Sequence, residues 1–432
     1  MIATLLFAVF IITMMLGVPI GASLGLAGAA AIALANAEAP WFGLLAVPHT
    51  ACAGGAAAAP LALTLVVLVG SIFDRSGVAL RLVNFAIALV GRGPGMLPLV
   101  AICVAMFLGG ISGSGPANAA AVGAVMIAAM NRAGYPASYS ASVVGAAAAT
   151  DILIPPSVAF IVYSVLVPGA SVPALFAAGM IPGVLAGIAL IVPAVWMARK
   201  HGMGHLESSL PRPPLLKSFI DAIWGLAAPV LILGGMRMGW FTPTEAAVVA
   251  VFYGLFVGLF VHRSMTLRDL FPILKESGEL SAVILLVVSL AGIFAFSLST
   301  LGVIDPITRA IVNSGLGEYG VLALLILMLI TIGMFLDGVS IFLIFVPLLW
   351  PIVQHYNWDP VWFGVLLTLK VALGQFTPPL AVNLMVSCRI ANVRMEETVR
   401  WVGPMLLAMG LVMVAVIIWP ELALWLPRVL GY

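Results

Sequence analysis

Long apolar stretches with few charged positions make up most of the chain, and their lengths predict helices that cross a bilayer. A crossing helix needs about 20 apolar residues. We expect ten such spans, at residues 2–16, 19–36, 50–73, 137–170, 173–198, 221–238, 243–261, 281–301, 361–388 and 401–420. The composition agrees, since 63% of the residues are hydrophobic and only 8% are charged. The pattern predicts an all-α polytopic membrane protein.

Two apolar stretches do not fit a single crossing. Residues 97–130 contain no Lys, Arg, Asp or Glu, but the sequence GGISGSGP interrupts them and leaves 13 apolar residues on each side. Residues 320–350 are interrupted near Asp337 and Gly338. Because glycine and proline are the residues least suited to a helix interior, we expect each stretch to fold back on itself as a re-entrant hairpin.

Two of the expected spans contain paired prolines. DILIPPS interrupts residues 137–170, and GQFTPP interrupts residues 361–388. Proline has no backbone N–H, so each pair leaves carbonyl groups upstream without a helical donor. These two spans are therefore predicted to be broken helices.

The hairpins and broken helices occur once in each half of the chain. FLGGIS at 107–112 recurs as FLDGVS at 335–340, and IPPS at 154–157 recurs as TPPL at 377–380. Isolated residues repeat at similar offsets: Pro19 with Pro243, Gly95 with Gly320, and Pro182 with Pro404. We predict a first repeat (1–198, with scaffold helices within 1–73), a polar linker (199–218) and a second repeat (219–432). Five spans per half invert the second copy in the membrane, which is typical of secondary transporters.

The distribution of Lys and Arg predicts the orientation of the chain. With the N-terminus outside, fourteen of the 18 Lys and Arg residues lie on the cytoplasmic side, three (Arg237, Arg309, Arg428) lie outside, and Lys370 lies within a span. Positive charge favours the cytoplasmic side, so both termini are predicted to be periplasmic. The sequence has no basic patch suited to nucleic acid, and its three isolated cysteines favour neither a disulfide framework nor a metal motif.

The breaks provide oxygen atoms for a cation at bilayer depth. Sodium favours oxygen ligands, and freed carbonyls and hydroxyls supply them without an ionised ligand. One candidate set is Ser112, Gly113, Ser114 and Asn118 with carbonyls near Asp151 and Pro155; the other is Asp337, Gly338 and Ser340 with Thr377 and Pro378. A Gly/Ser cluster also fits a close-packing face, and an aspartate also fits a cap of a broken helix. A hairpin break and a paired-proline break occur together in each half, and this repetition favours sodium as a coupling ion. No other cofactor is expected.

Helix N-termini beyond the breaks present donors suited to an organic anion. The candidate substrate-binding residues are Gly115, Pro156, Ser157, Lys370, Pro379 and Asn383. An unpaired charge at the depth of Lys370 costs at least ~2.5 kcal/mol, so a partner is expected unless the side chain reaches the interface. A substrate carboxylate, Asp337 and Asp151 are the candidate partners, and we expect the substrate.

Several motifs resemble a known family. GISGSGPANAAAVG, LIPPS, FTPTEAA at 241–247 and DPVWFGVLLTLKVALGQFTPPLAVNL at 359–384 resemble the large membrane subunit of tripartite ATP-independent periplasmic (TRAP) transporters, over essentially the whole chain. The resemblance implies a sodium-coupled organic-acid importer of a bacterial or archaeal inner membrane, with an elevator-type, ion-transporter-superfamily-like fold. It also implies two partners, a small four-helix membrane subunit and a periplasmic substrate-binding protein.

The chain departs from the family pattern at four positions. Gly115 and Asn118 stand where the family often has Ser and Thr, Asp151 lies in a usually uncharged stretch, and Lys370 replaces a commonly neutral, Asn-like residue. These departures bear on the number of ions and on the substrate.

Two alternatives to a TRAP subunit remain. One is a stand-alone sodium/carboxylate or anion carrier, which neighbouring genes would distinguish because it needs no partner. The other is a purely structural anchoring subunit, whose role would not require two symmetric polar breaks. The sequence has no HExxH, no GxSxG and no clustered His and Cys, so we do not expect an enzyme.

Overall fold

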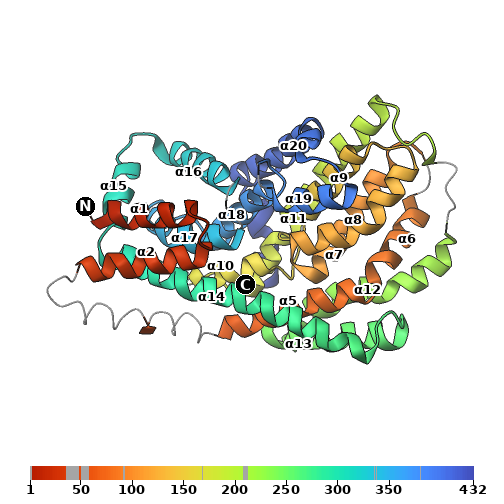
Figure 1. Ribbon diagram of the computed structural model, residues 1–432, viewed down its shortest axis with the longest axis horizontal. Coiled ribbons are helices and arrows are strands. Elements are labelled where there is room, and N and C mark those ends of the chain that lie inside the picture. Colours follow the sequence, from red (N-terminus) through yellow and green to blue (C-terminus); the bar gives the residue numbers. More distant parts are fainter. Residues whose placement is uncertain are drawn as a thin grey trace.

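The computed structural model describes residues 2–35, 48–49, 58–90, 93–167, 169–207, 213–334, 336, 338–379 and 381–432. These residues form helices joined by turns and loops, without a strand, which confirms the all-α fold class (Figure 1). The first half contains α1 (Ile2–Met15), α2 (Ile20–Ala35), α5 (Ala58–Arg75), α6 (Val78–Val90), α7 (Met96–Ser112), α8 (Gly115–Arg132), α9 (Ala137–Ala148), α10 (Val158–Leu166) and α11 (Val172–Lys200). The second half contains α12 (Leu215–Arg237), α13 (Pro243–Phe256), α14 (Leu270–Thr300), α15 (Ile304–Val312), α16 (Gly317–Gly333), α17 (Gly338–His355), α18 (Pro360–Gly374), α19 (Val382–Ala391), α20 (Val399–Ile418) and α21 (Glu421–Leu430).

Local sequence signals explain where several of these helices begin. The Asp359 carboxylate accepts hydrogen bonds from the backbone N–H groups of Val361 (2.8 Å) and Trp362 (3.1 Å), which caps α18. Thr242 and Glu245 form a capping box at the start of α13. The motifs DPVW and FTPTEAA are therefore helix-start signals.

Six helices in the described part of the chain are long and apolar enough to cross a membrane, and seven if the bent pair α5 and α6 is counted as one span. The broken helices are not among them, because α9, α10, α18 and α19 have 12, 9, 15 and 10 residues. At 18 residues, α17 of the second hairpin is among them, so this leg alone is long enough to cross.

The helix interruptions lie where Gly and Pro predict them. In the first half, α7 and α8 pack together as a hairpin around Gly113 and Ser114, and nine residues, 149–157, separate α9 from α10. In the second half, α16 and α17 form the corresponding hairpin, and residues 375–381 separate α18 from α19. Each half thus contains one hairpin and one broken helix, while their inverted orientation in a membrane stays a prediction.

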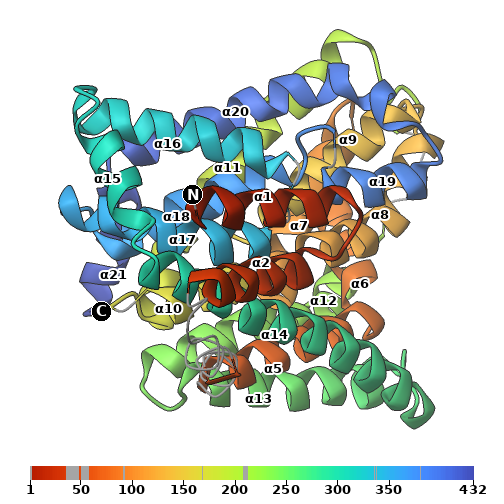
Figure 2. The ribbon, with the colours of Figure 1, turned by 60° about the vertical axis from the view of Figure 1, so that its left-hand side comes forward.

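The two halves interleave at their broken helices. The second-half helix α19 packs against α8 and α9, and the first-half helix α10 packs against α17 and α18 (Figures 1 and 2). Each broken helix therefore contacts the hairpin of the other half. The two hairpins and the two broken helices together form one connected body.

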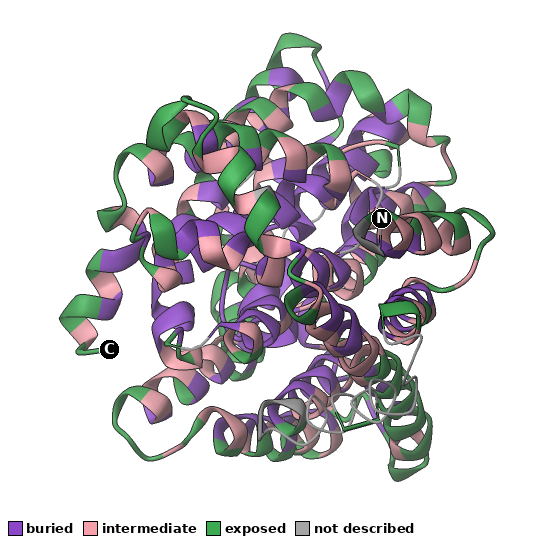
Figure 3. Cartoon of the chain, turned by 90° about the vertical axis from the view of Figure 1, so that its left-hand side faces the viewer, coloured by how far each residue is buried: buried purple, intermediate pink, exposed green. Residues whose placement is uncertain are grey.

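A shell of helices lies beside this body. Helices α1 and α2 pack together, α2 packs on α14, and α14 packs on α5. Gly21, Gly25 and Gly28 form the face of α2 that meets α14; for example, a Cβ on Gly21 would lie 2.9 Å from Val287 Cγ2. Small residues at such spacing let membrane helices approach closely. Buried residues gather in the interior helices, whereas the periphery is exposed (Figure 3) and carries large apolar side chains such as Phe252, 68% exposed.

Some elements differ from the sequence expectations. The expected span 281–301 is part of α14, which begins at Leu270; its 31 residues extend about 46 Å, longer than a bilayer core of about 30 Å. Helix α6 and the short helices α15 and α21 were not expected, because charged residues interrupt their apolar runs. The beginning of the expected span 50–73 lies outside the described residues.

Candidate ion and substrate site at the helix breaks

The tip of the first hairpin rests on the first broken helix. Gly113, the residue that ends α7, has φ +62°, and a Cβ there would lie 2.5 Å from the carbonyl oxygen of Pro156. Only glycine combines this backbone angle with this close approach. Pro156 follows Pro155 through a cis peptide bond, within the segment that separates α9 from α10.

Asp151 is the central charged residue of this junction. Its side chain is fully buried, and its Oδ2 accepts a hydrogen bond from Ser112 Oγ at 3.1 Å. Its Oδ1 has no hydrogen-bond partner among the described residues. Gly109 lies directly against it, since a Cβ on Gly109 would be 2.9 Å from Oδ1. A buried carboxylate with an unfilled oxygen fits a cation ligand, because burying the charge is costly unless a cation or donor compensates it.

The other candidates around the first break have different contacts. Asn118 Nδ2 donates to the Ala105 carbonyl of α7 at 2.8 Å, and Asn118 Oδ1 is buried with no hydrogen-bond partner in the described structure. Ser157 Oγ donates to the Ile152 carbonyl at 2.6 Å and so closes the unwound segment on itself. The structure thus brings Ser112, Gly113, Asp151 and the Pro155–Pro156 segment together, whereas the Asn118 amide joins the two legs of the hairpin.

In the second half, three helix ends converge. A Cβ on Gly374, the last residue of α18, would lie 2.8 Å from the carbonyl oxygen of Gly333, the last residue of α16. Gly338, the first residue of α17, lies against Val371 of α18. The candidate ligand Asp337 lies outside the described residues.

The remaining second-half ion candidates lie on these same elements. Ser340 is buried on α17, and Thr377 Oγ1 donates to the Leu373 carbonyl at 2.6 Å. Pro378 and Pro379 form the second cis peptide bond. This segment therefore shares its cis Pro–Pro bond with the Pro155–Pro156 segment. Its Thr377 hydroxyl is already hydrogen-bonded to the end of α18.

Lys370 lies at this convergence of helix ends. Its side chain is only 1% exposed, although it belongs to one of the longest side-chain types. Its Nζ has no hydrogen-bond partner in the part of the chain that the structure describes. Gly333 lies directly against Nζ, because a Cβ on Gly333 would overlap it. The ammonium therefore points to the C-terminal end of α16.

The N-termini of α8 and α19 meet at a polar cluster. Asn383 Nδ2 donates to Gln375 Oε1 at 3.0 Å, and Asn383 Oδ1 has no hydrogen-bond partner within the described residues. A Cβ on Gly115 would lie 2.6 Å from Gln375 Oε1 and 2.8 Å from the Asn383 amide. Gly115 and Asn383 were expected at the substrate site, whereas Gln375 was not, although it lies within the GQFTPP motif.

This architecture, an all-helical membrane protein with hairpins and broken helices in both halves, is typical of secondary transporters. The sequence matches, over residues 7–422, the family described as "Tripartite ATP-independent periplasmic transporter, DctM component". The chain therefore belongs to this family and is the large membrane subunit of a TRAP transporter.

Individual relatives agree with this membership. The C4-dicarboxylate TRAP transporter large permease protein DctM of Pseudomonas aeruginosa is 36% identical over 374 residues, which cover 86% of each chain. The sialic acid TRAP transporter large permease protein SiaM of Vibrio cholerae is 34% identical over 86% of this chain and 87% of its own. The isethionate TRAP transporter permease protein DctMQ of Oleidesulfovibrio alaskensis is 35% identical over 94% of this chain, which spans 63% of that longer protein.

A solved structure supports the fold. The YdaH transporter of Alcanivorax borkumensis aligns with a TM-score of 0.57 over 89% of this chain and 90% of its own, at 14% sequence identity. The chain is thus a multi-pass component of a membrane transporter and not an enzyme. Membership of the family implies a small membrane subunit and a periplasmic binding protein as partners.

Proposed function

We propose that the chain imports an organic acid across a bacterial or archaeal inner membrane, coupled to an inward flow of sodium ions. A periplasmic binding protein delivers the substrate, and a four-helix membrane subunit completes the transporter, with both termini of the present chain in the periplasm. The observation that best supports sodium coupling is the state of Asp151. Its carboxylate is fully buried at the junction of the first hairpin and the first broken helix, and one of its oxygens is unpartnered among the described residues.

The residues around Asp151 suit a sodium ion. Ser112 holds one carboxylate oxygen by a hydrogen bond and leaves the other available, and Gly113 brings the hairpin tip onto the Pro156 carbonyl. Oxygen donors of this kind bind hard cations. The inward flow of sodium supplies the driving force, while these residues fix the ligands in a water-excluded position.

The cluster at the N-termini of α8 and α19 suits the substrate. Asn383 keeps an unpartnered acceptor oxygen there, which suits a hydroxyl donor of the substrate, and its amide donates to Gln375. Gly115 has no Cβ and therefore packs directly against both side chains. N-terminal backbone N–H groups favour carboxylates. The named substrates of relatives, a C4-dicarboxylate, sialic acid and isethionate, are organic acids and agree with this class.

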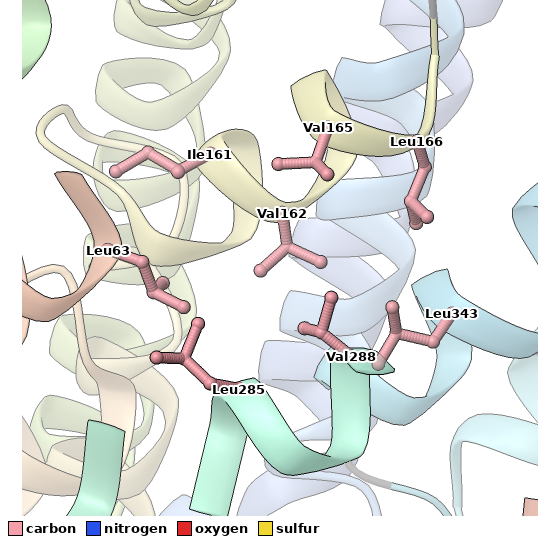
Figure 4. A pocket seen from close by; sticks show the side chains of 8 residues that line it. All are labelled: Leu63, Ile161, Val162, Val165, Leu166, Leu285, Val288 and Leu343. Atoms are coloured by element: carbon pink, nitrogen blue, oxygen red, sulfur yellow. The ribbon is translucent and has the colours of Figure 1, made fainter. Parts of the chain in front are cut away.

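An apolar pocket supports movement of the interleaved body against the shell. Eight aliphatic side chains line it: Leu63 of α5, Ile161, Val162, Val165 and Leu166 of α10, Leu285 and Val288 of α14, and Leu343 of α17 (Figure 4). Contacts of this kind are non-directional, so a shift costs no directed hydrogen bond. An elevator-type movement therefore fits this surface.

The test is uptake into proteoliposomes that contain this chain, its small membrane subunit and its binding protein, with a panel of labelled organic acids. Uptake of at least one acid is expected with an inward sodium gradient and the binding protein present. Uptake that continues unchanged in a proton gradient without sodium contradicts sodium coupling. Uptake that needs no binding protein favours the stand-alone carrier.

We also predict that Ser112→Ala raises the sodium concentration for half-maximal uptake by roughly tenfold. The substitution removes a hydrogen bond to a charged group, worth about 1.5–3 kcal/mol, and leaves the helix packing in place. Ser297→Ala is the matched control, because Ser297 is equally buried but donates to the Phe294 carbonyl of its own helix at 2.7 Å. Equal sodium dependence in both variants and the parent contradicts the role of Ser112.

A further inference from the structure

We propose that the Lys370 ammonium takes the place of a sodium ion at the second-half break, so that this chain binds sodium only at the first-half break. Lys370 is then a built-in cation that stays with the protein through the transport cycle. This inference rests on the proposed sodium coupling and specifies how many ions take part.

The inference rests on the position of the Lys370 ammonium at the C-terminal end of α16. Lys370 extends from the last turns of α18, and its Nζ lies against Gly333, the final residue of α16. Gly374 ends α18 beside the same Gly333 carbonyl. The C-terminal end of α16 thus faces this buried cation, and helix C-termini carry partial negative charge that favours cations.

Gly333 allows this contact because it has no side chain. A Cβ at that position would overlap Nζ, so a glycine is required for the ammonium to reach the helix end. The side chain is 1% exposed, which leaves Nζ sealed from solvent. Nζ donates to no partner among the described residues and lies as a point charge beside the C-terminus of α16, whose partial negative charge favours a cation at that place.

The first half has the opposite charge at its break. Asp151 supplies a buried carboxylate with an unpartnered oxygen, and a bound sodium ion would compensate its negative charge. Lys370 supplies a buried positive charge at the second break, and a sodium ion beside it would be repelled. The expected pair of equivalent sodium sites therefore becomes one sodium site and one lysine site.

This position differs from the expected substrate contact of Lys370. Substrate would approach the polar cluster of Gly115, Gln375 and Asn383 at helix N-termini, whereas Nζ faces a helix C-terminus. C-terminal carbonyl groups repel carboxylates. The two roles make different predictions, because a substrate contact changes substrate affinity and a built-in cation changes the number of sodium ions.

The experiment measures thermal unfolding of the purified full-length chain in detergent against sodium chloride concentration. Choline chloride keeps the ionic strength constant. At sodium concentrations well above the dissociation constant, stability rises with the logarithm of sodium in proportion to the number of bound ions. The slope of stability against the logarithm of sodium concentration should correspond to one bound ion in the parent. Asp151→Asn should show no sodium-dependent slope, and Lys370→Gln should show about twice the parental slope.

The controls separate the possible outcomes. Lys370→Met also removes the charge and is the second variant if the glutamine chain does not fold, while Lys275→Gln removes an exposed lysine and should keep the parental slope. Asp151→Asn combined with Lys370→Gln should restore the slope of one ion. A two-ion slope in the parent, or equal slopes in the parent and the Lys370 variants, overturns this inference alone. A parent that does not respond to sodium overturns the proposed sodium coupling itself.

Discussion

Buried polar groups fall into two kinds at the scale of single residues. At the breaks, Asp151, Lys370 and Asn383 each keep a polar atom without a hydrogen-bond partner among the described residues. Glu207, between α11 and α12, is also buried, but its Oε1 accepts from Leu97 N–H at 2.9 Å and its Oε2 from Tyr135 O–H at 2.6 Å. The satisfied acid fastens the segment after α11 to the start of α7, whereas the unsatisfied groups at the breaks are those that the proposed function assigns to ligands.

The Glu207 contact predicts how stability depends on pH. Burial raises the pKa of the Glu207 carboxyl above its ordinary value of 4.5. The folded protein therefore keeps this proton at pH values where the unfolded chain has lost it, so this contribution to stability is full below pH 4.5 and falls as the pH rises through the folded pKa. Glu207→Gln should flatten the dependence of the melting temperature on pH in this window.

Thermal unfolding of purified protein from pH 4.5 upward checks this prediction. Glu279→Gln, on the exposed surface of α14, is the control and should keep the parental pH profile. An identical pH profile for the parent and Glu207→Gln would show that the buried carboxyl does not govern stability in this range.

At the scale of helices, Gly and Pro in the sequence predict where each hairpin and broken helix is interrupted. The turn at Gly113 and the Pro155–Pro156 segment lie where the motifs place them, because their effect on the backbone is local. The contacts of Gly333 with Lys370 and of Gln375 with Gly115 were not predictable, since they join elements distant in sequence. Short helices such as α15 were missed because charged residues, here Asp305 and Arg309, interrupt their apolar runs.

The tip of the first hairpin provides a test of helix-break geometry. Gly113→Ala should lower the free energy of unfolding by at least ~3 kcal/mol, because it adds a Cβ 2.5 Å from the Pro156 carbonyl oxygen. Gly302→Ala is the matched control: Gly302 has φ +60°, but nothing lies within 4 Å of its added Cβ. The control should lose only the backbone cost of about 1–2 kcal/mol.

Chemical and thermal unfolding of both variants measures this difference. If Gly113→Ala and Gly302→Ala are equally stable, the hairpin tip does not depend on close contact with the first broken helix. The comparison separates the backbone angle, which both glycines share, from the contact, which only Gly113 makes.

At the scale of the whole molecule, the interleaving of the halves determines which helices would move together in the proposed elevator movement. Because α19 packs on α8 and α9 while α10 packs on α17 and α18, the two breaks belong to one body. Helices α5 and α14 face this body across the aliphatic pocket of Figure 4. In the proposed elevator movement, the expected scaffold within residues 1–73 would therefore include α14 of the second half, and the proposed ion and substrate sites would lie together on the other side of the pocket.

This division predicts the effect of cross-links across the pocket. In a chain whose Cys52, Cys103 and Cys388 are replaced, Val162→Cys with Val288→Cys joins α10 to α14, whereas Leu63→Cys with Leu285→Cys joins α5 to α14 within the shell; both pairs line the same pocket. Oxidation of the first pair should reduce uptake in proportion to the cross-linked fraction, and a reductant should restore it. The second pair should leave uptake unchanged, because it joins helices on the same side of the moving surface. Full uptake with the α10–α14 pair completely cross-linked would mean that this body does not slide against α14, and the elevator movement would have to be abandoned.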